Sequence, residues 1–127
     1  MKTILRPPTP VPPPSEEVTV LCSSGGRLVH LHMISDAWAR DYSFDPAQAV
    51  KLWRCLMGEV STVTPDDVHD DTMKLWNHVD PKLGDLWEFI DASGARRLCL
   101  DADQALALAW AIKDCCSAAL SGVEYGE

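Results

Sequence analysis

Residues 18–34 read VTVLCSSGGRLVHLHMI, two apolar runs that flank a turn of small residues. Branched apolar residues favour strands, and the Ser-Ser-Gly-Gly sequence between them is typical of a tight turn. The stretch therefore predicts a β-hairpin. Side chains alternate along its second strand, so one face carries Val29, Leu31 and Met33 and the other carries His30 and His32.

A second hairpin is predicted near the C-terminus, where residues 86–90 and 96–100 form another pair of apolar runs. The linking sequence Asp91-Ala92-Ser93-Gly94 has an aspartate to open a type I turn and a glycine to accept the positive φ that closes it.

Two segments combine a capped start with an apolar stripe, as helices do. Residues 45–58 open with aspartate and proline, carry a glutamine three residues after the aspartate, and end at a glycine. Residues 101–121 open with Asp101 or Asp103 and continue as a broad apolar face. We expect a helix over each segment, and we expect the second to be the central packing element.

A third helix is predicted over residues 64–79. Thr64 and Asp67 match a capping box, and the helix would end at Asp80 because a residue before proline is pushed out of the α region. The predicted buried stripe is Val68, Thr72, Leu75, Trp76 and Val79. A short helical turn is also predicted from Ser35 to Tyr42.

Together these elements predict an α+β fold: a small antiparallel sheet of two hairpins packed with three to four helices. The length of 127 residues suits one domain, which we place at residues 18–127. Residues 1–17 are expected to form a disordered, proline-rich N-terminal tail. No apolar run approaches the roughly 20 residues of a membrane span, and no secretory signal is evident, so a cytoplasmic location is expected.

The charge is strongly negative, at -8 overall. This argues against direct nucleic-acid binding, which depends on lysine and arginine. Residues 59–91 hold nine acidic against two basic residues, a net of -7. Helix-dipole compensation at the predicted helix start accounts for some of these acids, and solubility alone is the competing explanation for the rest.

We therefore predict a non-enzymatic protein-interaction module, an inhibitor or adaptor that docks an acidic surface on a basic, nucleic-acid-handling partner. Phage-encoded inhibitors and immunity proteins provide the physical analogy, as nucleic-acid mimics. The acids predicted to bind the partner are Asp66, Asp67, Asp70, Asp71, Asp80, Asp85 and Glu88.

Leu106 and Trp110 complete the predicted contact surface. On a helix they lie one turn apart, opposite the apolar face and beside Asp103, Lys113 and Asp114. We favour cover by another element of the same fold, such as the segment from Tyr42 to Phe44. The alternative is an apolar anchor within a polar rim, which is the composition of a binding hot spot.

Two other functions stay open. A metal-dependent hydrolase would use His30 and His32 with a carboxylate from Asp70 or Asp71. In a structural homo-oligomer, Leu106 and Trp110 would face their own symmetry mate. The five cysteines lack paired spacing and are interpreted as reduced and mostly buried. No cofactor motif is present, and we expect a monomer or homodimer.

Overall fold

The computed structural model describes residues 2–5, 18–34, 39–69, 72–91 and 97–122. Its strands form two antiparallel sheets, sheet A in the order β1-β2-β3-β4 and sheet B in the order β5-β6-β7-β8. In chain order the elements are β1 (Lys2–Leu5), β2 (Val18–Gly25), β3 (Leu28–Ile34), β4 (Ala39–Phe44), α1 (Pro46–Leu56), β5 (Thr62–Val63), β6 (Met73–Asp80), β7 (Gly84–Asp91), β8 (Arg97–Leu100) and α2 (Ala102–Leu120).

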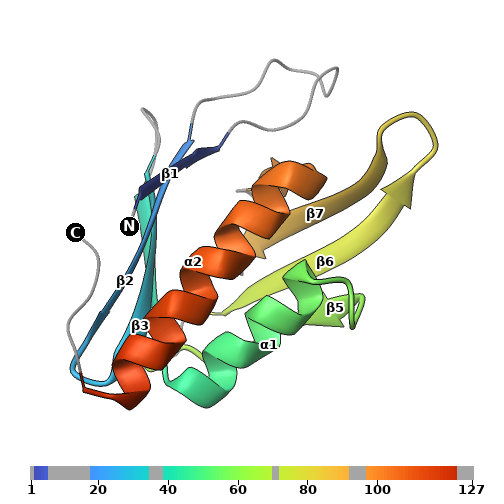
Figure 1. Cartoon of the computed structure of the whole chain (residues 1–127). Helices are drawn as coiled ribbons and strands as arrows, with labels where there is room; N and C mark the ends of the chain where they lie inside the picture. The colour runs from blue at the N-terminus through green and yellow to red at the C-terminus, as the bar shows by residue number, and fades with distance from the viewer. Residues whose placement is uncertain (1, 6–17, 35–38, 70–71, 92–96, 123–127) are drawn as a thin grey trace.

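The two helices pack against each other and against both sheets (Figure 1). α2 lies mainly on β2 and β3 of sheet A, whereas α1 lies on β5 and β6 of sheet B. Each helix therefore chiefly covers the sheet that does not immediately precede it in the chain. The α+β single-domain prediction is confirmed at this level, with two sheets.

The chain repeats one architecture, an antiparallel meander followed by a helix. The helix caps Asp45 and Asp101 are 56 residues apart, and each accepts a hydrogen bond from the N–H of a glutamine three residues later. The buried positions of the helices share this offset: Ala49, Leu52, Cys55 and Leu56 in α1 correspond to Ala105, Leu108, Ala111 and Ile112 in α2.

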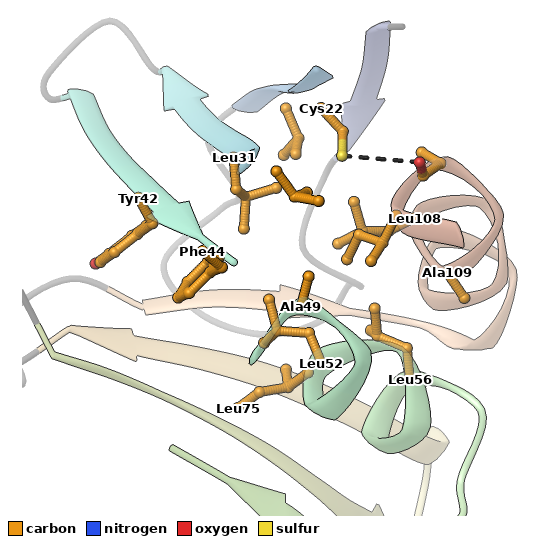
Figure 2. Packing of buried hydrophobic residues seen from close by; sticks show 14 of the residues in the cluster. Cys22, Leu31, Tyr42, Phe44, Ala49, Leu52, Leu56, Leu75, Leu108 and Ala109 are labelled. Atoms are coloured by element: carbon orange, nitrogen blue, oxygen red, sulfur yellow. Dashed lines mark hydrogen bonds between the residues drawn. The ribbon is translucent and has the colours of Figure 1, made fainter. Parts of the chain in front are cut away.

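One hydrophobic cluster joins the sheets through the helices. Figure 2 shows Leu31 and Phe44 of sheet A, Leu52 of α1, Leu75 of sheet B and Leu108 of α2 within this cluster. All five are at most 1% exposed. Burial of such side chains stabilises by about 1.5–3 kcal/mol each, so the core fixes the helices relative to the sheets.

The first predicted hairpin is confirmed as β2–β3, with Val29, Leu31 and Met33 buried. The first strand continues further than expected, to Gly25, and the second begins at Leu28. The turn is therefore Gly26-Arg27, both with positive φ near 60°, as a type I′ hairpin turn requires.

The second predicted hairpin is confirmed as the antiparallel pair β7–β8, although residues 92–96 of its turn lie outside the described residues. The helices predicted over residues 45–58 and 101–121 are also confirmed. In α2 the capping box is complete, because Gln104 Oε1 accepts a hydrogen bond from the backbone N–H of Asp101.

The helix predicted over residues 64–79 is wrong. This region forms β5, the bridge between Asp66 and Thr72, and the eight-residue strand β6. Burial alternates along the start of β6: Met73 and Leu75 are buried, whereas Lys74 and Trp76 are exposed. This period of two is that of a strand. Pairing with β7 along the whole of β6 outweighs the local capping signal.

Other differences are smaller. The prediction of a helical turn from Ser35 to Tyr42 is wrong over residues 39–42, which belong to β4. Residues 35–38 lie outside the described residues. The expected three to four helices reduce to two in the described part of the chain. Within residues 1–17, Lys2–Leu5 form β1 paired with β2, and residues 6–17 are not described. Neither helix has the apolar length that a membrane crossing requires.

Candidate functional site

The outward side of α2 carries a partly exposed apolar ridge. Leu106 is 46% and Trp110 54% exposed. The ammonium of Lys113 lies 4.9 Å from the centre of the Trp110 ring, a cation–π contact, and Asp103 and Asp114 are exposed alongside. The predicted position opposite the apolar face is confirmed.

The expected intramolecular cover of Trp110 is wrong. Tyr42 and Phe44 belong to β4 and are 3% and 0% exposed, so they pack inside the core. Half of the Trp110 side chain remains open to solvent, and the ridge on α2 is available to another molecule.

α1 presents a matching outward side. Val50 and Met57 are 41% and 44% exposed, and Lys51 and Arg54 are exposed with them. With the 56-residue offset, Val50 corresponds to Leu106 and Arg54 to Trp110, so the same helical positions face outward in both halves. We call the combined surface the helix face; it consists of Val50, Lys51, Arg54, Met57, Asp103, Leu106, Trp110, Lys113 and Asp114.

The predicted acidic surface is divided. Asp66 is exposed, whereas Asp67 is 5% exposed and accepts hydrogen bonds from the backbone N–H groups of Ser43 (2.5 Å) and His69 (2.6 Å). Asp67 therefore ties the connection between β5 and β6 of sheet B to the edge strand β4 of sheet A. Asp70 and Asp71 lie outside the described residues.

The remaining predicted acids lie along or beyond β6. Asp80 accepts hydrogen bonds from the N–H groups of Lys82 and Leu83, and these bonds lower the pKa of its carboxyl group. Asp85 is exposed nearby. Because Thr72, the bridge partner of Asp66, precedes Asp80 by eight extended residues, about 26 Å separates the two groups of acids. They do not form one compact patch.

Glu88 belongs to a cluster that the sequence did not predict, on the side of sheet B away from the core. His78 Nε2 lies 2.8 Å from Glu88 Oε1, with the two side chains 21% and 15% exposed. The Trp76 ring stacks on His78 at 4.0 Å between centroids. Because β6 was predicted as a helix, the register that opposes Trp76 to Glu88 was inaccessible from sequence.

The histidines of the hydrolase hypothesis already have partners. His30 Nδ1 lies 2.8 Å from Ser43 Oγ and its Nε2 lies 3.0 Å from the carbonyl of Gly25. His32 Nδ1 lies 2.5 Å from Asp41. Within the described ranges no group of three or more histidine, cysteine or acidic side chains is arranged to hold a metal ion. The candidate carboxylates Asp70 and Asp71 are outside those ranges, so the hypothesis stays a prediction.

Four of the cysteines are poor nucleophiles. Burial raises the pKa of Cys55, Cys99 and Cys116 to about 11 in each case. The pKa of Cys22 is raised by a hydrogen bond with Cys115 and by burial, and Cys22 Sγ also donates to the carbonyl of Ala111 (Figure 2). A thiol that stays protonated at neutral pH neither attacks substrates nor binds metals readily.

Comparison of the chain with protein-family models, curated proteins and solved structures finds no match. In the described part of the chain, nine large apolar side chains are exposed, and four of them, Val50, Met57, Leu106 and Trp110, lie on the helix face. The helix face is therefore the strongest candidate site.

Proposed function

We propose that this chain is a non-enzymatic protein-interaction module that contacts its partner through the helix face. The observation that carries the proposal is the 54% exposure of Trp110 on a regular helix, with Leu106 one turn away. Tryptophan is enriched at the energetic centres of protein interfaces. Covering the open half of such a side chain contributes about 2–3 kcal/mol at 25 cal/mol per Å².

The ordered packing of α2 beneath the helix face favours this role. Ala109 and Ile112, on the buried side of α2 beside Trp110, are 0% and 1% exposed. The helix is capped at Asp101 by a reciprocal pair of hydrogen bonds. A contact surface that is already ordered loses little conformational entropy when a partner binds, which benefits affinity.

An inhibitor or adaptor acting on a basic, nucleic-acid-handling partner remains a narrower hypothesis. The net charge of -8 and the exposed carboxylates Asp66 and Asp85 support it. Its test is binding to a candidate basic partner over a salt series, for wild type and for the Asp66→Asn, Asp85→Asn double variant. Unchanged affinity and salt slope would remove the electrostatic contribution of these two acids.

The proposed function is tested by photo-crosslinking in the native host. A benzophenone amino acid replaces Leu106 in one variant and Val79 in the control variant. Val79 is 73% exposed but lies next to the last residue of β6, outside the helix face. We expect crosslinked protein adducts from position 106 and few from position 79. Equal yields, or none from position 106, would contradict the proposal.

A further inference from the structure

We infer that the partner of the helix face is a second copy of this chain, bound in a two-fold symmetric dimer that places α1 of each copy against α2 of the other. This inference rests on the proposed function and names its partner. It follows from the distribution of charge and apolar surface over the two helices.

The two helices of the helix face differ in charge. α1 contributes the bases Lys51 and Arg54, and α2 contributes the acids Asp103 and Asp114, all of them exposed. Arg54 also contacts Glu59 at 3.2 Å, but both side chains are about half exposed, so this contact is weak. Lys113 on α2 is held over the Trp110 ring.

This distribution is self-complementary in one arrangement. With α1 opposite α2 of the second copy, bases meet acids twice across the two-fold axis, while Val50 and Trp110 supply apolar contact between them. With α1 opposite α1, Lys51 and Arg54 would face their own copies, and like charges facing each other oppose association.

A basic third protein fits this surface less well. It would meet Lys51, Arg54 and Lys113 together with the two acids. The acids that favour a basic partner, Asp66 and Asp85, lie outside the helix face. Charge complementarity on this surface therefore favours self-association.

The area of the helix face indicates the affinity that we expect for the dimer. α2 has 19 residues and spans about 28 Å, and two helices side by side are about 20 Å wide, which gives roughly 500 Å² per chain. The total of roughly 1,000 Å² is at the lower limit for a specific interface. We therefore expect a reversible dimer with a dissociation constant in the micromolar range.

Sedimentation velocity over about 5–200 µM tests the inference with two charge-reversed proteins. One carries Lys51→Glu and Arg54→Glu, and the other carries Asp103→Lys and Asp114→Lys. The first then has acids on both helices and the second has bases on both. We expect each to be monomeric alone and an equimolar mixture to form a heterodimer. Lys74→Glu and Asp85→Lys, exposed on sheet B, serve as controls and should leave the dimer unchanged.

Trp110→Ala provides a second variant, because loss of an exposed side chain leaves the fold intact. We expect the dissociation constant of its dimer to be at least tenfold higher than that of the wild-type dimer. Circular dichroism verifies the fold of every variant.

The outcomes separate this inference from the proposed function. A monomeric wild type whose position 106 crosslinks to a different protein overturns the inference and retains the function. A dimer that survives both charge reversals and Trp110→Ala also overturns it. A monomer with no crosslinks at position 106 overturns both. Heterodimer formation by the mixed variants supports the inference.

Discussion

The indole Nε1 of Trp87 donates a hydrogen bond of 2.7 Å to the main-chain carbonyl of Cys55. This contact joins β7 of sheet B to the C-terminal end of α1 inside the core, where Trp87 is 7% and Cys55 0% exposed. The same carbonyl accepts the N–H of Gly58, whose φ of 82° reverses the chain after the helix. One carbonyl thus helps to hold both the helix end and its position on the sheet.

Trp87→Phe is expected to lower the free energy of unfolding by about 1–3 kcal/mol, because it removes this hydrogen bond and leaves a void beside α1. Urea unfolding followed by far-ultraviolet circular dichroism measures the change. Trp110→Phe, the matched change at an exposed position, should alter stability by less than about 0.5 kcal/mol. Similar losses for the two variants would contradict the core position of Trp87.

Asp67→Asn is expected to destabilise the protein by about 1.5–3 kcal/mol. One of the two acceptor oxygens becomes an amide donor that opposes the N–H group of Ser43 or His69. Asp66→Asn makes the same chemical change at the neighbouring exposed carboxylate and should have little effect. Thermal unfolding measures the melting temperature of both variants. An equal shift for the two would refute the structural role of Asp67.

Asp80 should contribute stability that depends on pH. Hydrogen bonds from the N–H groups of Lys82 and Leu83 lower its pKa from the ordinary 3.8, so folding favours the ionised carboxylate. The contribution is therefore fully present above pH 3.8 and is lost as the pH falls through the lower pKa of the folded state. Asp80→Asn should be less stable than wild type at neutral pH, and the difference should shrink below about pH 4. Melting temperatures across this range, with Asp85→Asn as control, measure the effect; a constant difference would count against it.

The thiols should react slowly with a disulfide reagent while the protein is folded. Cys99 is the least buried of the five and has a pKa of about 11, so its labelling rate should rise with the thiolate fraction as the pH increases and level off only above about pH 11. All five cysteines should react at once in guanidinium chloride. Cys99→Ser should remove the first phase in the folded protein. Rapid labelling at pH 7 would show that these thiols are more accessible or more acidic than the structure indicates.

Features fixed by neighbouring residues were predictable from sequence. The caps Asp45 and Asp101 each depend on contacts within one helical turn, and the alternation along β3 depends on one strand. The outward position of Trp110 followed from helical geometry alone. Its exposure did not, because that depends on which elements pack nearby.

β6 shows why other features of the fold could not be predicted from the sequence. Thr64 and Asp67 have the spacing of a capping box, yet the Asp67 carboxylate binds the N–H of Ser43, 24 residues away in the chain. The sequence Asp80-Pro81-Lys82-Leu83-Gly84 was interpreted as a helix end, although aspartate before proline also opens hairpin turns, as it does here. The 56-residue repeat was a further signal, since Asp-x-x-Gln-Ala occurs at Asp45 and at Asp101.

Each helix mainly covers the sheet that it does not follow in the chain, and this arrangement has a consequence during synthesis. Sheet A is complete once residue 44 has emerged from the ribosome, but α2, its main cover, is made from residues 102–120. Until then the apolar side of sheet A lacks that cover, exposed to wrong contacts with other nascent chains. The N-terminal half therefore cannot finish folding until α2 has been synthesised, more than 50 residues after sheet A.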